Sequence, residues 1–409
     1  MAYLLLKDCM ELLTMADDST DLVGIRYGES ILIEDERVKK IGKYNKIIKG
    51  LHEDDLDIID CSDYVVMPGY VDSHTHLIFG GSRVDEYVEL LTNTPDEVKK
   101  RVGRVGLDSS MHATKNAEDD ELHKSSALKL ERMLKSGTTT VEIKSGYGID
   151  KDTELRMLRI VDGIRKTVPS TIFSTYLGAH YYDVEMGKEK YIDYMIKEVM
   201  PTIKEEKLAQ FSDVWCDHGY YTAEESYRVL SAGRDYGMVP SIHTECYSSI
   251  GGAKVAAELR AANAGHLNYL SEKDTNLLRD AGVVGVLLPG TDFSVKHSRP
   301  FNPRPMIDAG LEIAIATNLN PGNWIENMDI ALTLACRNHG MSEKEALRAA
   351  TLGGAKALRV SNDYGSLEEG KFADIQIRKS DSYKNVVYKF GVDEMAYVIK
   401  HGSIVYDNK

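Results

Sequence analysis

Two histidines separated by one residue are the clearest chemical signal in this sequence. His74 and His76 lie in the segment DSHTH, directly after a short apolar run. Alternate residues of an extended strand point to the same side, so both imidazoles are expected to project together. Two neutral imidazoles side by side form a good half-site for Zn²⁺ or Fe²⁺. Two polar residues that merely end a strand would give the same pattern, so the motif alone leaves a metal site open.

Three further histidines close or follow apolar runs later in the chain. His243 ends MVPSIH, His266 ends AANAGH, and His180 follows the third run in YLGAH. One such histidine is more often a hydrogen-bonded structural residue than a ligand. Here several predicted strands deliver a histidine at the same end, and carboxyl ends of strands are where barrel enzymes place catalytic groups. As a set, these histidines favour a metal site.

The elements that must position these side chains alternate between β-type runs and amphipathic stretches. Stretches such as ELHKSSALKLERMLKSG and SEKDTNLLRDAG end at or near a glycine, which is a natural helix stop. Eight alternations over roughly 250–300 residues predict an α/β fold, a (β/α)₈ TIM-type barrel. A doubly wound open sheet is the structural alternative. The predicted strands are Tyr70–His74, Thr138–Lys144, Thr171–Leu177, Asp213–Cys216, Met238–His243, Ala262–His266, Val283–Leu288 and Leu311–Thr317.

Short β-type runs at both ends of the chain frame the predicted barrel. Examples are GESILIEDERVKKIG before Pro68 and MAYVIKHGSIVYDNK at the end of the chain. We expect the two ends to pair into a small β-sandwich domain made of residues 1–67 and 356–409, with the barrel at 68–355. The polar stretch 101–120 is poorly patterned and is predicted to be a long loop on the active-site side of the barrel.

Composition limits the partners of this chain of 409 residues. A formal net charge of −14 argues against nucleic acid or an anionic membrane as the main partner. No apolar run approaches the roughly 18–20 residues that span a bilayer. The start MAYLLLKDC contains Lys7 and Asp8 and lacks a basic leader, which predicts a first strand instead of a signal peptide. Five scattered cysteines without a CxxC motif indicate the cytoplasm. The oligomeric state stays open, with a homodimer as one option.

Several segments closely resemble the imidazolonepropionase family of the amidohydrolase superfamily. They are PGYVDSHTHLIFGGSR, MLKSGTTTVEIKSGYG, YLGAH, SIHTE, GVLLPGT and IATNLNPG, within residues 60–377. FGGSR and KSGYG are fairly specific to that family, whereas HxH and the tail GSLEEGKFADIQI mark the superfamily. The resemblance implies a hydrolase with one divalent ion, Zn or Fe, that opens a five-membered cyclic amide or amidine. Its first candidate reaction converts 4-imidazolone-5-propanoate to N-formimino-L-glutamate in histidine degradation.

Carried over position by position, the family pattern implies a role for each of several residues. An arginine fork suits a carboxylate, which agrees with a substrate that bears a propionate. The resemblance implies metal ligands at His74, His76, His243 and position 318; contacts to the substrate or product from Arg83, Tyr147, His180, Cys246, Asn320, Gly322 and Asn323; and an attacking water held by His266.

The first departure from the family pattern is Asn318, where the family has an aspartate that ligates the metal and shuttles protons. An asparagine carbonyl can still ligate a metal, but weakly and without charge, and it cannot accept a proton at neutral pH. Glu245 and His266 are therefore the candidates for the proton acceptor.

The second departure is Cys246, where the family has an acidic or amide side chain that touches the substrate. As a thiolate Cys246 could be a replacement ligand, and as a buried thiol it would be inert. The family also carries a glycine-rich stretch after Arg83 that shapes the substrate pocket, and RVGRVGLDSSMHAT does not match it.

Three functions are compatible with these features. The first is imidazolonepropionase-like ring opening, and the second is a paralogous amidohydrolase that acts on a different cyclic amide or heterocycle. The third is a non-catalytic protein that binds a metal or a small carboxylate. In the two enzymatic cases the expected partner is a small heterocycle, bearing a carboxylate in the first of them. Metal analysis separates the third function from the others, and substrate profiling separates the first from the second.

Overall fold

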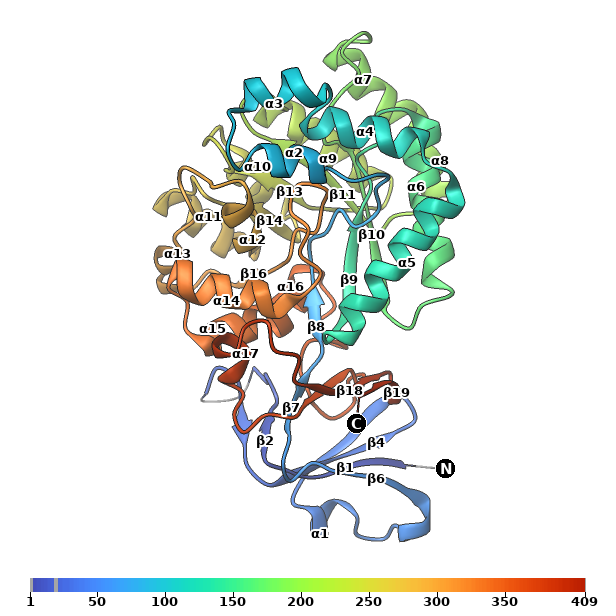
Figure 1. The fold of residues 1–409 in the computed structure, drawn as a ribbon, viewed down its shortest axis with the longest axis vertical. Helices are drawn as coiled ribbons and strands as arrows, with labels where there is room; N and C mark the ends of the chain where they lie inside the picture. The colour runs from blue at the N-terminus through green and yellow to red at the C-terminus, as the bar shows by residue number, and fades with distance from the viewer. Residues whose placement is uncertain (1–2, 18–20, 409) are drawn as a thin grey trace.

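Parallel strands surrounded by helices form the larger part of the molecule, and a smaller β domain lies below them in Figure 1. The structure is a computed structural model that describes residues 3–17 and 21–408. In this part of the chain a nine-stranded parallel sheet has the order β16-β15-β14-β13-β11-β10-β9-β8, with β12 paired to β11. The strands are β8 (Tyr70–Asp72), β9 (Thr138–Lys144), β10 (Thr171–Ala179), β11 (Phe211–Cys216), β12 (Val239–Pro240), β13 (Ile242–Thr244), β14 (Asn263–His266), β15 (Val284–Leu287) and β16 (Ile313–Ile315).

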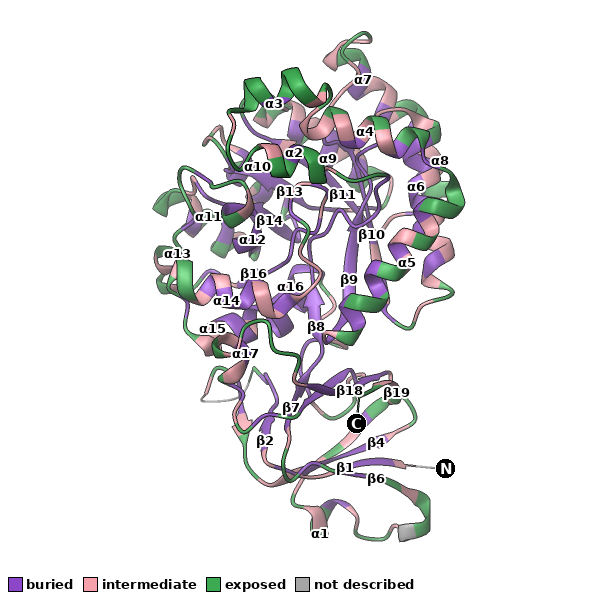
Figure 2. Ribbon diagram, in the orientation of Figure 1, coloured by how far each residue is buried: buried purple, intermediate pink, exposed green. Residues whose placement is uncertain are grey.

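This sheet confirms the predicted (β/α)₈ barrel, because β12 and β13 together occupy the fifth strand position. Pro240 lacks a backbone N–H, and the fifth strand is interrupted just after it, at Ser241. The strands are buried along their length (Figure 2). In β9, Val141 and Ile143 pack in a cluster with residues of two covering helices, whereas Glu142 alternates with them and is hydrogen-bonded across the sheet to Thr175.

Helices alternate with the strands, as the sequence predicts, and local signals set their ends. Thr222 and Glu225 form a capping box at the start of α9, and Gly282 ends α11 in the left-handed conformation with φ +71°. No helix in the described part of the chain is long and apolar enough to cross a membrane. The principal covering helices are α5 (Asp119–Lys135), α6 (Lys151–Arg165), α8 (Met200–Glu206), α9 (Ala223–Asp235), α10 (Gly252–Leu259), α11 (Glu272–Ala281), α14 (Met328–His339) and α16 (Gly354–Ala357).

The first and eighth strands are joined at their carboxyl ends, and helix α16 packs against the first strand. At the carboxyl end Asp72 accepts hydrogen bonds from the backbone N–H and the hydroxyl of Thr317, at 3.1 and 2.5 Å. The backbone N–H of Asn318 donates to the carbonyl of His74 at 3.0 Å. Gly354, the first residue of α16, packs so tightly against β8 that a Cβ there would lie 2.2 Å from the Val71 carbonyl oxygen. The barrel is therefore closed by residues next to the predicted ligands.

The two ends of the chain form one small β domain, as expected. One sheet has the order β5-β4-β1-β6, and the other has the order β19-β18-β17-β7-β2-β3. Strand β7 pairs with β2 and with β17, which joins the ends in one sheet, and side chains of both sheets share one core. The boundaries at residues 67 and 355 stay predictions. The strands are β1 (Tyr3–Cys9), β2 (Glu11–Leu13), β3 (Ile25–Arg26), β4 (Glu29–Glu34), β5 (Arg37–Gly42), β6 (Leu56–Asp60), β7 (Val65–Pro68), β17 (Ile375–Arg378), β18 (Met395–Lys400) and β19 (Ser403–Asp407).

The prediction of a long loop at 101–120 is wrong. This stretch contains the end of α3 (Pro95–Val102), all of α4 (Gly106–Asn116) and the start of α5. The buried residues of α4 are Ser110 and Thr114, and Thr114 accepts a hydrogen bond from the backbone of Gly80 at 3.0 Å. Because the fully buried residues of α4 are small and polar, and its apolar Leu107 and Met111 are only partly buried, the apolar periodicity of this helix is weak. With α2 (Val84–Glu89), helices α3 and α4 lie above the barrel (Figure 1), on the expected side.

Candidate active site

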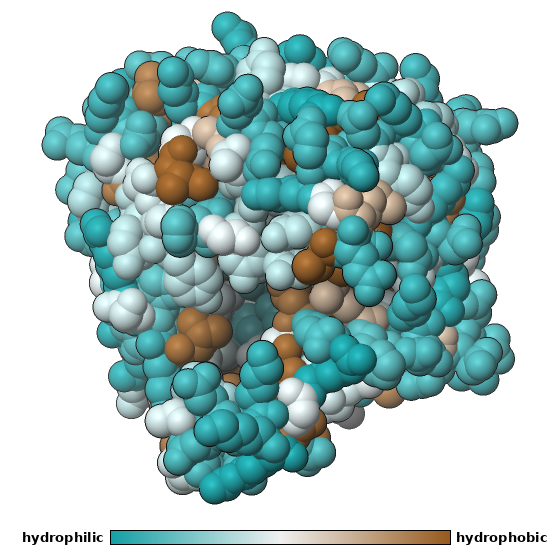
Figure 3. Space-filling view, turned by 90° about the horizontal axis from the view of Figure 1, so that it is seen from above, coloured by the Kyte–Doolittle hydropathy of each residue, from teal (hydrophilic) through white to brown (hydrophobic). Residues whose placement is uncertain are grey.

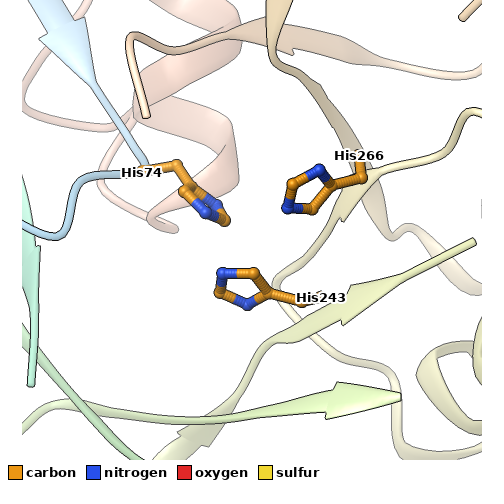
Figure 4. Close-up of side chains that lie close together, drawn as sticks. All are labelled: His74, His243 and His266. Atoms are coloured by element: carbon orange, nitrogen blue, oxygen red, sulfur yellow. The ribbon is translucent and has the colours of Figure 1, made fainter. Parts of the chain in front are cut away.

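Imidazoles from three strands converge at the carboxyl end of the barrel. His74 follows β8, His243 lies in β13, and His266 ends β14, with Thr244 paired to His266 in the sheet register. One ring nitrogen from each of these three residues lies within 4.8 Å of the others, and Figure 4 shows the rings directed toward one another. The Nε2 atom of His76 lies 3.2 Å from Nε2 of His243. Four imidazoles therefore face one small volume.

The chemistry of this cluster suits a divalent cation. Both ring nitrogens of His74 and Nδ1 of His76 are buried, with no hydrogen-bond partner among the described residues. Burial, reinforced by nearby positive charges, lowers the pKa values of His74, His76 and His266 well below the usual range. These three imidazoles are thus neutral and offer lone pairs. Two nitrogens each about 2.0–2.1 Å from one zinc ion are separated by about 3 Å, close to the His76–His243 spacing.

A buried charged network holds His243. Asp213 accepts hydrogen bonds from Nδ1 and from the backbone N–H of His243, both at 3.1 Å. Lys144 donates to Asp213 at 2.8 Å and to Glu142 at 2.9 Å. Although burial raises the pKa of Asp213, His243 and Lys144 lower it below its ordinary value. The carboxylate therefore stays ionised and leaves Nε2 of His243 free to face the other imidazoles.

We expect Asp213→Asn to weaken metal binding about 10- to 100-fold, the usual cost of losing a partner that orients a ligand. The amide is a poorer acceptor for the Nδ1 proton of His243. Asp217→Asn is a matched control, because Asp217 accepts hydrogen bonds from the backbone of Cys246 and Tyr247. Metal affinity measured by competition with a chelator checks this prediction. Equal affinities in Asp213→Asn and the unmodified protein would contradict it.

A cavity of about 810 Å³ opens above the histidines. The hollow is visible at the centre of the barrel face in Figure 3, with hydrophobic side chains at its rim. Every residue that the family resemblance assigned to substrate or product lines this one cavity. These residues are Arg83, Tyr147, His180, Cys246, Asn320, Gly322 and Asn323, together with His76, His243, His266 and Asn318.

His180 and Tyr147 form the wall beside His76. The ring of His180 stacks on that of His76, with centroids 4.9 Å apart, and its Nδ1 lies 3.1 Å from the carbonyl oxygen of Gly146. Burial lowers the pKa of His180 to about 3 and raises that of Tyr147 above its usual value. At neutral pH this wall offers uncharged hydrogen-bonding groups to a ligand.

Asn318 enters the site in a strained conformation. Its φ is +49°, in the left-handed region, which asparagine tolerates better than most residues. Its side-chain nitrogen donates to the Thr291 hydroxyl at 2.8 Å. The side-chain oxygen is buried and has no hydrogen-bond partner within residues 3–17 and 21–408. This oxygen has the chemistry of a neutral metal ligand.

Of the neighbouring residues Cys246 and Glu245, only Cys246 lines the cavity. Cys246 lines the cavity, and burial raises the pKa of its thiol, which keeps it protonated. The carboxylate of Glu245 accepts a hydrogen bond from the backbone of Ala253, at the start of α10, at 3.4 Å. Glu245 is not among the described residues that line the cavity. Of the two sequence-based candidates for a proton acceptor, only His266 lies at the site.

Sequence reasoning missed several residues of the site. Asp213 and Lys144 carry charge inside strands that the predicted barrel buries, which was the available signal, because buried charges are costly unless they are paired. The aromatic side chains of the cavity have no such signal, because large aromatics are equally common in cores. The unpredicted lining includes Glu86, Tyr87, Trp215, Tyr220, Tyr247 and Thr291.

Known proteins share both the sequence and the fold. The amidohydrolase family profile matches residues 65–405. An imidazolonepropionase of Clostridium tetani is 39% identical over 389 residues, which cover 94% of this chain and 92% of the relative. One of Alkaliphilus metalliredigens is 37% identical and covers 100% and 99%. Among solved structures, an adenosine deaminase from Xanthomonas campestris with bound zinc has a TM-score of 0.73 at 17% identity, covering 98% of this chain and 92% of that one.

A barrel of this topology with converging histidines at its mouth defines a class of metal-dependent hydrolases. The chain belongs to the amidohydrolase family, and within that family to the group of the imidazolonepropionases.

Proposed function

We propose that this protein hydrolyses the ring C–N bond of 4-imidazolone-5-propanoate to give N-formimino-L-glutamate, a step of histidine degradation. Water adds to the ring carbonyl carbon, the bond from that carbon to nitrogen breaks, and the nitrogen takes a proton. Relatives named imidazolonepropionase align with nearly the whole chain. The observation that carries the proposal is the single cavity, which brings every residue implied for substrate and product next to the imidazole cluster.

We assign one divalent ion, zinc or iron, to His74, His76 and His243, with the side-chain oxygen of Asn318 as a weak neutral ligand. When bound, such an ion supplies a Lewis acid that activates water and polarises a carbonyl. The assignment is supported by the 3.2 Å between the Nε2 atoms of His76 and His243. It is also supported by the two ring nitrogens of His74, which have no hydrogen-bond partner among the described residues.

His266 is the proposed proton acceptor. Its neutral ring lies within the same 4.8 Å group, lines the cavity and can hold the attacking water by a hydrogen bond. The strained φ of +79° at His266 turns the chain sharply at the end of β14, and such strain is concentrated at active sites. His266 would take the proton from water and return it to the leaving nitrogen.

Arg83 is the proposed partner of the substrate carboxylate, and Arg83→Lys tests this role. A lysine is a point charge and cannot reproduce the bidentate fork, so we expect KM for the carboxylate substrate to rise about 10-fold. Turnover of an analogue without the carboxylate should change little. Arg104→Lys is the control, because Arg104 pairs with Asp108 in an exposed ion pair. Equal effects on both substrates in Arg83→Lys would count against the role.

A paralogous activity on another cyclic amide is the second candidate. Cys246 and Asn318 favour it, because both replace side chains through which the family contacts substrate or metal. The test of function is to measure the metal content of the purified protein and its turnover of imidazolonepropionate and of other five-membered cyclic amides. Bound metal with turnover of another cyclic amide alone would favour the paralogue, and absence of both metal and turnover would contradict both candidates.

The free cysteines of the described chain support a location in the cytoplasm.

A further inference from the structure

We propose that Glu86 is a positioning residue that decides which edge of the Arg83 guanidinium meets the substrate carboxylate. The inference rests on the proposed function, because it assumes that Arg83 binds that carboxylate. Neither the sequence motifs nor the names of the relatives assign Glu86 any role.

Glu86 already holds one edge of Arg83. Nε of Arg83 donates to one carboxylate oxygen of Glu86 at 3.0 Å, and Nη2 donates to the other at 2.5 Å. This is the paired, side-on geometry of a strong arginine–carboxylate contact. The Glu86 side chain is 8% exposed and that of Arg83 is 19% exposed, so solvent screens the pair little.

The same carboxylate also fixes the roof of the cavity. One oxygen of Glu86 accepts a hydrogen bond from the backbone N–H of Gly106 at 3.0 Å. Gly106 is the first residue of α4 and has φ +62°, a left-handed conformation that glycine adopts without strain. Arg83, Glu86 and Gly106 all line the catalytic cavity. Glu86 therefore links α2, α4 and the arginine into one unit.

Only one edge of the guanidinium remains for a ligand. Arginine has five N–H donors, and Glu86 occupies the edge formed by Nε and Nη2. The other fork is formed by Nη1 and the second N–H of Nη2. Nη1 lies 3.0 Å from the point that a Cβ on Gly322 would occupy, so this fork borders the loop of Asn320 and Gly322. A substrate carboxylate would then be bound between Arg83 and that loop.

A carboxylate at position 86 is needed for this arrangement. Glu86 accepts three hydrogen bonds, two on one oxygen (from Nε of Arg83 and the backbone of Gly106) and one on the other (from Nη2 of Arg83). Glutamine has a single acceptor oxygen with two lone pairs, so it can accept from at most two of these donors, and its NH₂ group would face the third. The guanidinium of a Glu86→Gln protein could rotate, and its open fork would no longer be fixed toward Gly322.

The test is a binding measurement with two probes that differ only in the carboxylate. Imidazole-4-propanoate and 4-propylimidazole are titrated calorimetrically into the metal-loaded protein. We expect the unmodified protein to prefer the propanoate and Glu86→Gln to lose about 10-fold of that preference, as expected for a misaligned fork. Affinity for 4-propylimidazole should stay the same, and KM for the carboxylate substrate should rise with little change in kcat.

Glu89→Gln is the matched control on the same helix. Glu89 pairs with Arg101 and lies outside the cavity lining of the described chain, so both probes should bind it as they bind the unmodified protein. Equal weakening of both probes by Glu86→Gln would indicate a merely structural role and overturn the proposal. Tighter binding of the propanoate would also overturn it, because Glu86 would then only compete with the ligand.

Two further outcomes separate this proposal from the proposed function. If the unmodified protein binds both probes equally, the carboxylate role of Arg83 fails and the Glu86 proposal fails with it. If the unmodified protein prefers the propanoate and Glu86→Gln keeps the full preference, only the Glu86 proposal fails. Should Glu86→Gln not fold, Glu86→Asp keeps the charge but shortens the reach. It is expected to lose part of the preference, and full preference there would contradict the proposal.

Discussion

Replacement of His243 by alanine is expected to remove the metal and to lower kcat/KM by more than about 10²-fold, the upper range for residues that only orient a ligand. His243 provides Nε2 to the cluster and is the imidazole fixed by Asp213. The barrel should remain folded, because the pairing of β13 with β11 and β14 is made by backbone atoms, which alanine keeps. Metal content by mass spectrometry, kinetics and circular dichroism check these expectations.

His266→Ala distinguishes a ligand from a proton acceptor in this experiment. If His74, His76 and His243 hold the ion, His266→Ala should keep stoichiometric metal and lose about 10²- to 10⁴-fold in rate, the usual range for general-base catalysis. His76→Ala should lose the metal. The opposite pattern, with metal lost in His266→Ala and kept in His76→Ala, would make the ligand set His74, His243 and His266, the three residues whose ring nitrogens lie within 4.8 Å.

The barrel could be predicted because its signals are local. The run Thr138–Lys144 agrees residue for residue with β9, since β-branched residues between glycine-marked helix ends specify a buried strand. The strand ends were less exact. His74 was predicted within the first strand, but β8 ends at Asp72. Beyond Asp72 the backbone of the loop that carries His74 and His76 is hydrogen-bonded to the loop after β16.

The residues that position the site could not be predicted, because their roles depend on distant partners. Lys144 and Asp213 are 69 positions apart in sequence, and Glu86 and Gly106 are 20 apart. Glu86 on a short helix has the sequence signal of an ordinary exposed glutamate. Only the fold shows that this carboxylate is buried against an arginine.

Asn318 is hydrogen-bonded both to the loop that carries His74 and to Thr291 in the cavity lining. Its backbone N–H binds the carbonyl of His74, and its side chain binds Thr291 through the amide nitrogen. The side-chain oxygen is buried and has no hydrogen-bond partner in the part of the chain that the structure describes. An aspartate in this position would place a negative charge where asparagine offers only a dipole, and it could accept a proton as well as ligate the ion.

Asn318→Asp is therefore expected to bind the metal more tightly and to hydrolyse imidazolonepropionate faster. If the neutral side chain limits the reaction, the rate should rise about 10²-fold or more, comparable to restoring a general base. The measurement compares kinetics and metal content of the two proteins side by side. Asn320→Asp is the control, because it adds the same charge to the cavity loop two residues later. A similar gain from it would point to a general effect of charge.

The result also decides between the two candidate substrates. The gain in Asn318→Asp would be specific to imidazolonepropionate if the natural reaction is that of the relatives. If metal binds more tightly but this rate does not rise, the proton must pass through another group, and the structure provides His266 in the same cluster. In that case Asn318 and Cys246 are adaptations to a different cyclic amide. Metal-loaded proteins that hydrolyse no cyclic amide, with either residue at position 318, would contradict the proposed activity.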